Sequence, residues 1–279
     1  MTYKFETIET NGIHLHTVLA GPEDGQPVFL LHGFPDAWFG WNSQIESLAD
    51  AGFRVIVPDQ RGYNLSDKPL GIGNYAMPLL VDDILGLADV FGYEQFHLAG
   101  HDFGAMVAWN LAMHHPECIK KMVIANVPHP IVMRNYLRTQ PKQMLKSWYA
   151  LFFQIPKLPE LVVRMNSWQF LISAMPEDLT EEERNQYREA WNQPGAMTGM
   201  INWYRASMQK SQQTLDVPKI IVPTLILWGK QDPHLSYQMA QLSVDLCDEG
   251  ELITFGDASH WVLFDQPDAT SKYLIHHFS

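Results

Sequence analysis

Apolar segments recur along the chain and alternate with segments whose apolar residues have helical spacing. Continuous apolar runs that end in polar or glycine residues are typical of strands buried in a parallel sheet. Such runs occupy residues 28–33, 54–60, 96–102, 121–127 and 224–230. Residues 14–21 alternate in polarity like a half-exposed strand, and residues 251–256 form a further predicted strand. Helical spacing is found in residues 41–52, 78–93, 103–117 and 236–250. This order predicts an α/β fold, with a mostly parallel central sheet flanked by helices and a functional site at the carboxyl ends of the strands.

The alternation stops between the predicted strands 121–127 and 224–230, where Trp, Tyr, Phe, Met and Pro are frequent. We predict that residues 129–215 form a helical cap inserted between two parts of the core, residues 1–128 and 216–279. Because both ends of the insertion attach to the functional edge of the sheet, it should lie over the strand ends as a lid. A separate helical domain with no role in catalysis is the alternative, and these attachment points disfavour it.

Composition limits the kinds of ligand and the cellular location that we expect for this protein. The 279 residues carry a net charge of −12, which disfavours nucleic acid and favours a small, uncharged ligand. Cys118 and Cys247 lie far apart and have no metal-ligand spacing around them, so they predict neither a disulfide framework nor a zinc site. With no basic leader and no apolar run of membrane-spanning length, we predict a soluble, cytoplasmic protein.

Residues 98–109, LAGHDFGAMVAW, have the frame of a nucleophile elbow, a sharp turn from strand to helix. Asp102 stands where a serine is usual, and Gly100 and Gly104 flank it. The start of a helix stabilises an ionised carboxylate, so we interpret Asp102 as a nucleophile rather than only a helix cap. Attack by this carboxylate on an electrophilic carbon would form an ester on the protein itself.

An elbow nucleophile needs an acid and a histidine, which follow it in that order along the chain. Asp232 follows the strand 224–230, and His260 lies in the loop after the strand 251–256. The alternative place for the acid, after the strand 121–127, holds the uncharged Asn126, and Asp257 is a minor competitor because it is so near His260 in sequence. We expect His260, oriented by Asp232, to activate the water that hydrolyses the ester.

Ester hydrolysis passes through an oxyanion that needs backbone donors. The loop after the strand 28–33 is expected to supply the N–H of Phe34, and the start of the helix 103–117 that of Phe103. Pro35 can fix the first loop through a cis Phe34–Pro35 bond. Trp38 and Trp41 are equally well interpreted as pocket residues or as packing residues.

These segments together resemble the epoxide hydrolases of the α/β-hydrolase fold. The shared motifs, which run over nearly the whole chain, are HGFPDAWFGW, DQRGYNLSDKP, GHDFGA, the Asp232 loop and SHW. Asn64 departs from the glycine often found there, which bears on the loop more than on mechanism. The resemblance implies that two lid tyrosines donate to the epoxide oxygen, and SWYALFFQ and INWYRASMQ supply Tyr149 and Tyr204. A phenol with a pKa of about 10 can donate to a developing alkoxide while staying protonated at neutral pH.

The resemblance therefore implies a cofactor-independent, metal-free enzyme that converts an epoxide and water into a vicinal diol. Aromatic residues, among them Trp38, Phe153 and Trp203, are expected to line its pocket and to favour a small apolar epoxide with an aryl or long-chain substituent. The sequence leaves open whether the protein is a monomer or a homodimer.

Proteins with other functions share this scaffold, and each needs residues that can be checked in this sequence. Haloalkane dehalogenases hold halide with side-chain N–H donors, which Phe103 and Phe34 lack. Fluoroacetate dehalogenases use arginines just after the nucleophile, where Phe103 and Met106 stand here. An esterase would need a serine or cysteine at position 102. A non-catalytic ligand receptor could keep the fold while losing catalytic groups. This chain has all five candidate catalytic residues, which are Asp102, Asp232, His260, Tyr149 and Tyr204.

Overall fold

The computed structural model describes residues 3–209 and 219–279 and contains one eight-stranded sheet in the order β1-β2-β4-β3-β5-β6-β7-β8. Strands β3 to β8 run parallel to one another, while β2 is antiparallel to both β1 and β4. The predicted fold class is confirmed. The strands are β1 Lys4–Thr10, β2 Ile13–Ala20, β3 Pro27–Leu31, β4 Arg54–Pro58, β5 Phe96–His101, β6 Ile119–Ala125, β7 Thr224–Gly229 and β8 Gly250–Phe255.

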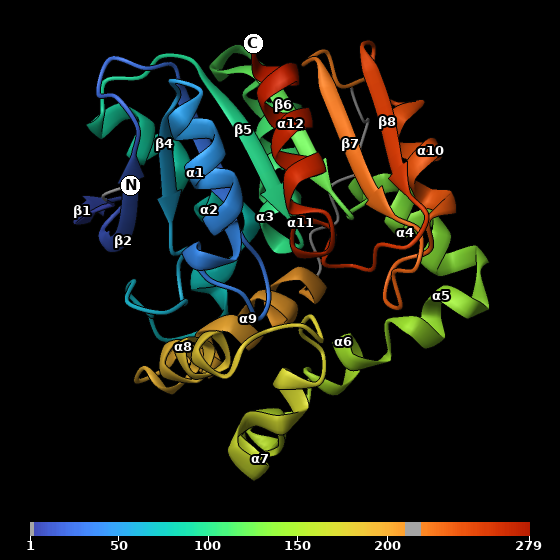
Figure 1. Cartoon of the computed structure of the whole chain (residues 1–279). Helices are drawn as coiled ribbons and strands as arrows, with labels where there is room; N and C mark the ends of the chain where they lie inside the picture. The colour runs from blue at the N-terminus through green and yellow to red at the C-terminus, as the bar shows by residue number, and fades with distance from the viewer. Residues whose placement is uncertain (1–2, 210–218) are drawn as a thin grey trace.

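Helices cover both faces of this sheet (Figure 1). Helices α1 and α12 pack on one another, α2 packs on α3, and α10 packs on β7 and β8. The helices of the core are α1 Asn42–Asp50, α2 Met77–Val90, α3 Phe103–His114, α10 Gln238–Val244, α11 Val262–Asp265 and α12 Pro267–Phe278. Three short 3-10 helices complete it: η1 Trp38–Trp41, η2 Ile72–Tyr75 and η3 Pro116–Cys118.

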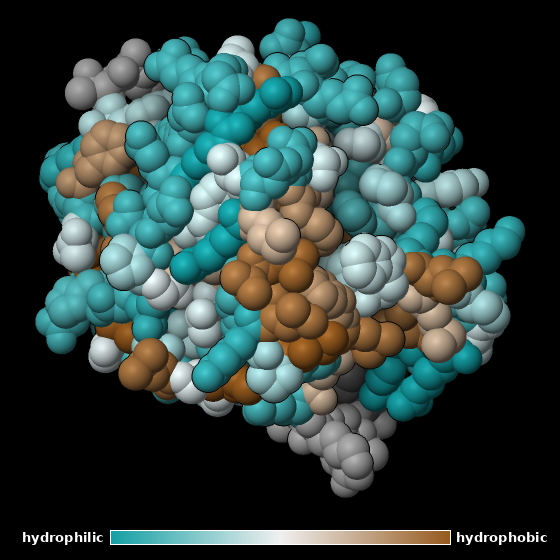
Figure 2. Space-filling view, turned by 90° about the horizontal axis from the view of Figure 1, so that it is seen from below, coloured by the Kyte–Doolittle hydropathy of each residue, from teal (hydrophilic) through white to brown (hydrophobic). Residues whose placement is uncertain are grey.

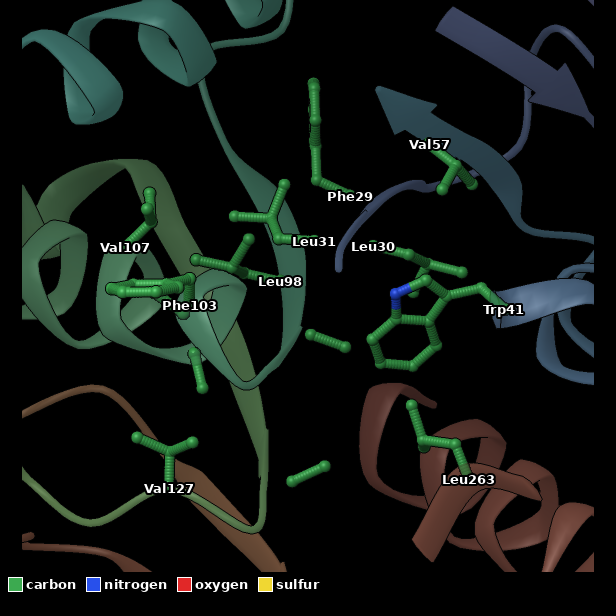
Figure 3. Close-up of a cluster of buried hydrophobic side chains, with 14 of the residues drawn as sticks. Phe29, Leu30, Leu31, Trp41, Val57, Leu98, Phe103, Val107, Val127 and Leu263 are labelled. Carbon is green, nitrogen blue, oxygen red and sulfur yellow. The ribbon is translucent and has the colours of Figure 1, made fainter. Parts of the chain in front are cut away.

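The core is built from the central strands, whose residues are buried on both faces. In Figure 3, Leu31 lies toward Val107 of α3, whereas its neighbour Leu30 lies beside Trp41. This alternation follows from the two-residue period of a strand, and burial of both sets explains the continuous apolar runs. Trp41 is 1% exposed and is a packing residue.

Strand β1 was not among the predicted strands. Its sequence KFETIET contains charged residues at three positions, and most of its side chains are exposed because it lies at the edge of the sheet. An edge strand that pairs with a single neighbour, here β2, and is mostly exposed leaves little hydrophobic signal in the sequence.

Among the described residues, six helices lie between β6 and β7, the interval predicted to hold the cap. They are α4 Pro130–Thr139, α5 Pro141–Lys146, α6 Trp148–Phe152, α7 Leu158–Ile172, α8 Glu181–Asn192 and α9 Ala196–Met208. Figure 1 shows α6 to α9 beyond the carboxyl ends of the strands. The predicted end of the cap at residue 215 lies outside the described residues.

Two hydrogen bonds join helix α8 to the loop after β3. The hydroxyl of Tyr187 donates to Asp36 Oδ1 at 2.8 Å, and Trp191 Nε1 donates to the carbonyl of Pro35 at 2.6 Å. All of these side chains are buried or nearly so. Helix α8 is therefore anchored directly to the loop that carries Phe34. Within the described residues, no helix has the length and apolar character needed to cross a membrane.

Candidate active site

Asp102 occupies the turn between β5 and α3 with φ 49° and ψ −123°, a conformation that side-chain-bearing residues rarely adopt. The turn places the carboxylate at the carboxyl edge of the sheet, with 19% of its side chain exposed. Helix α3 lies so close to β3 that a Cβ on Gly104 would overlap the backbone carbonyl of Leu31. Only glycine fits there, so this position fixes the sharpness of the elbow.

The loops after β7 and β8 bring Asp232 and His260 to Asp102. His260 Nδ1 lies 2.8 Å from Asp232 Oδ2, and His260 Nε2 lies 3.5 Å from Asp102 Oδ2. His260 and Asp232 are buried, with side-chain exposures of 6% and 0%. The imidazole thus lies between two carboxylates, with one nitrogen directed at each. Asp257, the minor competitor, instead accepts a hydrogen bond from Gln266 at 3.3 Å.

This arrangement shifts the pKa of all three groups. Burial alone would raise the pKa of Asp102 and of Asp232, but hydrogen bonds and charge from His260 hold both below their usual value. Burial would lower the pKa of His260, yet the charge of Asp232 and hydrogen bonds to both carboxylates raise it to about 10. At neutral pH the site therefore holds an ionised Asp102 beside an imidazolium.

One backbone N–H binds the other oxygen of Asp102, and a second backbone N–H lies close to it. The N–H of Phe34 donates to Asp102 Oδ1 at 2.7 Å. The N–H of Phe103 begins α3 and, among the described residues, has no hydrogen-bond partner. Both amides lie against Gly33, where a Cβ would overlap Asp102 Oδ1 and the Phe103 nitrogen. The Phe34–Pro35 bond is cis, as predicted.

Tyr149 of α6 and Tyr204 of α9 line the same cavity as Asp102 and His260. Their ring centroids lie 5.9 Å apart with an interplanar angle of 85°, and the Tyr204 ring lies 4.6 Å from that of Phe103. Neither hydroxyl has a hydrogen-bond partner within residues 3–209 and 219–279. Burial and the charge of Asp102 raise the pKa of both phenols, so both remain protonated donors.

The cavity has a volume of about 950 Å³, and its lining includes residues of α6, α7, α8 and α9 as well as of the loops at the carboxyl edge of the sheet. Phe153 lines it, as predicted, but Trp38 and Trp203 do not. Trp38 packs instead at the edge of the sheet, with its ring 5.6 Å from that of Tyr3. Trp203 is 2% exposed and donates its N–H to the carbonyl of Arg61 at 2.9 Å. Both tryptophans were wrongly assigned to the pocket, because their side chains turn into the protein interior.

Two residues of the site were not predicted. Asn126, at the alternative place for the acid, donates to Asp232 Oδ2 at 2.8 Å and accepts from the N–H of Gly229 at 2.9 Å. His101 Nε2 lies 2.9 Å from the carbonyl of His260. Asn126 thus fixes the acid that orients His260, and His101 fixes the loop that carries His260. The role of Asn126 in holding Asp232 could have been inferred from its position directly after β6.

Residues 26–267 match the protein family described as the alpha/beta hydrolase fold. The chain is 44% identical to the AB hydrolase superfamily protein YfhM of Bacillus subtilis strain 168, over 98% of this chain and 96% of that protein. It is 36% identical to epoxide hydrolase 4 of Homo sapiens, over 98% of this chain and 78% of that protein. The chain belongs to the epoxide hydrolases of the α/β-hydrolase superfamily. The predicted family is thus confirmed.

Solved structures extend the similarity to three dimensions. A novel epoxide hydrolase from metagenomes of hot environments is 32% identical with a TM-score of 0.91, covering 100% of this chain and 99% of that one. A mutant of Bacillus megaterium epoxide hydrolase, solved with its product (R)-3-(1-naphthyloxy)propane-1,2-diol, is 28% identical with a TM-score of 0.89. That match covers 98% of this chain and 99% of the other. The likeness therefore includes both the sheet and the helices over its edge.

Proposed function

We propose that this chain hydrolyses an epoxide to a vicinal diol, without a cofactor, through a covalent ester on Asp102. One observation carries the proposal: Asp102, His260, Tyr149 and Tyr204 line a single cavity. A carboxylate nucleophile, a base for water and two donors for the leaving oxygen are the groups that the two-step reaction needs. The direct test is chromatographic detection of diol from styrene oxide, with halide release from haloalkanes measured in parallel.

In the first step, a carboxylate oxygen of Asp102 attacks a carbon of the epoxide ring. Because the amide of Phe34 holds Oδ1, we assign the attack to Oδ2, on the side of His260. The ring carbon–oxygen bond breaks and its electron pair remains on the epoxide oxygen. Tyr149 and Tyr204 stabilise that oxygen by hydrogen bonds, and it takes up a proton through a tyrosine that solvent reprotonates.

In the second step, His260 removes a proton from water, which attacks the carboxyl carbon of Asp102. Oδ1 becomes the oxyanion and accepts from the amides of Phe34 and Phe103. The bond between the carboxyl carbon and Oδ2 then breaks, so Oδ2 leaves with the diol. The leaving oxygen takes up the proton of the hydroxyl that water added, which restores the carboxylate with one oxygen from water and leaves the other water proton on His260. Formation of the ester itself prepares this step: it removes the negative charge 3.5 Å from His260 Nε2, which lowers the pKa of His260 toward a neutral base.

We propose a neutral epoxide with an aryl or aryloxy substituent as substrate. The Bacillus megaterium enzyme, whose product carries a naphthyloxy group, supports this choice. So does the aromatic lining of the cavity by Phe34, Trp148 and Phe153.

Within this scheme we further propose that residues 129–215 act as the cap, since they supply both tyrosines. For location and assembly we keep the predictions made from the sequence, which are a cytoplasmic protein and either a monomer or a homodimer.

Replacing one lid tyrosine by phenylalanine is expected to slow ester formation by roughly ten- to a hundredfold, the value of one hydrogen bond to a charged oxygen. Tyr149→Phe/Tyr204→Phe should be slower than either single variant, because no donor then remains for the alkoxide. Single-turnover rates of ester formation measure this directly. Tyr237→Phe, a change at an exposed tyrosine, is the matched control. A double variant as fast as wild type would remove the tyrosines from the mechanism.

A negative charge on the substrate is expected to lower kcat/KM. The cavity lining includes five exposed acidic residues, and none of the described residues that line it is Lys or Arg. The five are Glu177, Asp178, Glu183, Asp257 and Asp265. We expect kcat/KM for 4-(oxiran-2-yl)benzoate to be about tenfold below that for its methyl ester, and the gap to shrink at high salt. Equal values at low salt would contradict an electrostatic filter.

A further inference from the structure

Helices α5 to α7 of the cap present large apolar side chains to solvent at intervals of three or four residues. Six of them, each 43–75% exposed, form what is called here the cap ridge: Leu145, Trp148, Leu151, Ile155, Leu158 and Leu161. These residues are spread over α5, α6, the turn after α6 and the start of α7, and large apolar side chains normally turn inward. Figure 2, which views the molecule from the cap side, shows a contiguous hydrophobic area there. Exposed apolar area of this extent marks an interaction surface.

The segment that carries the cap ridge has a net charge opposite in sign to that of the rest of the chain. Residues 129–165 contain six basic residues and one acidic residue, whereas the rest of the chain contains 13 basic and 30 acidic residues. The single acid, Glu160, pairs with Arg205 at 2.6 Å. Four basic residues of this segment are exposed: Arg138, Lys142, Lys157 and Arg164. The cap ridge is therefore an apolar strip accompanied by uncompensated cations.

We propose that the cap ridge binds the surface of a membrane that contains anionic lipid. Leucines and a tryptophan would enter the boundary between headgroups and acyl chains, and the four cations would contact lipid phosphates. The remaining acidic surface would be repelled, so only this face of the protein could approach. A second copy of the chain fits less well, because a two-fold interface through the cap ridge would bring the cations of one copy against those of the other.

Trp148 connects this surface to the cavity, because it belongs to the cap ridge and also lines the cavity. An apolar epoxide dissolved in the lipid would thus reach the cavity along an apolar path. Of the acidic residues that line the same cavity, Glu177, Asp178 and Glu183 would have to remain on the water side in this orientation. Docking in this orientation does not depend on which reaction the cavity catalyses.

The test is cosedimentation of the full chain with vesicles of phosphatidylcholine, with and without phosphatidylglycerol. Wild type is expected to sediment with the phosphatidylglycerol vesicles and to be released at high salt. Leu145→Glu/Leu151→Glu/Leu161→Glu should lower its affinity for them at least about tenfold. Val90→Glu, an equally exposed apolar position at the end of α2, is the matched control and should bind like wild type.

Lys142→Glu/Lys157→Glu provides an independent variant that leaves the apolar residues unchanged, should the triple variant fail to fold. It is expected to lose binding to the anionic vesicles. Failure of wild type to sediment with them, or unchanged binding by both variants, would overturn the proposal. A concentration-dependent dimer that the triple variant abolishes, without vesicle binding by wild type, would also overturn it and identify a second copy as the occupant.

Discussion

Replacement of His260 by glutamine is expected to stop the reaction after its first step and to leave the substrate attached to Asp102. Glutamine can still donate a hydrogen bond but cannot remove a proton from water, so ester hydrolysis should slow by about 10²–10⁴-fold. Ester formation needs only the carboxylate and the tyrosines, so it should persist. Mass spectrometry of the intact protein after mixing with styrene oxide should show one added substrate mass per chain.

Two variants make this result specific. His276→Gln changes an exposed histidine of α12 and should turn over like wild type without accumulating an adduct. Adding Asp102→Ala to His260→Gln should abolish the adduct, and peptide mapping should place it within residues 98–109. Full turnover by His260→Gln, or an adduct that survives Asp102→Ala, would contradict the assigned roles.

Asp102→Ala is expected to lose diol formation by at least about 10⁴-fold, because no other described group lies where it could attack the epoxide. The measurement is the steady-state rate with styrene oxide. The change also alters a residue at φ 49°, so thermal unfolding should be recorded for each variant. Asp102→Asn keeps the shape and tolerates positive φ, so it separates loss of the charge from loss of the fold.

Both Asp102 variants should be folded and inactive if the carboxylate is the nucleophile. Removal of its charge should also release His260 from one of its two ion pairs, which lowers the pKa of the imidazole. Substantial diol formation by a folded Asp102→Ala protein would mean that water attacks the ring directly and that no ester is required.

The catalytic positions were predictable because each follows a strand that can be recognised. Asp102, Asp232 and His260 lie one, three and five residues after the ends of β5, β7 and β8, and parallel strands bring their carboxyl ends to one edge of the sheet. Their nearness to one another therefore follows from topology rather than from fine packing. The tyrosines needed the added resemblance to a family, because helical spacing alone does not separate a lid donor from a core residue.

Side-chain direction was the part that the sequence did not reveal. Trp38 and Trp203 stand among pocket-like aromatic residues, yet packing turns both into the interior. Asn126 has no charge to mark it, and its role arises only because the loop after β7 folds back onto it. Strand β1 was missed because its polar sequence shows little of the apolar pattern of a strand, although it forms a local hairpin with β2 across the tight turn at Asn11 and Gly12.

The central claim is that an oxygen of Asp102, rather than of water, enters the diol in the first turnover. A single turnover of excess enzyme with styrene oxide in oxygen-18 water, followed by mass spectrometry of diol and peptides, tests it. The account predicts an unlabelled diol and label in the peptide that contains Asp102. A fully labelled diol from that first turnover, with no label in the peptide, would contradict it.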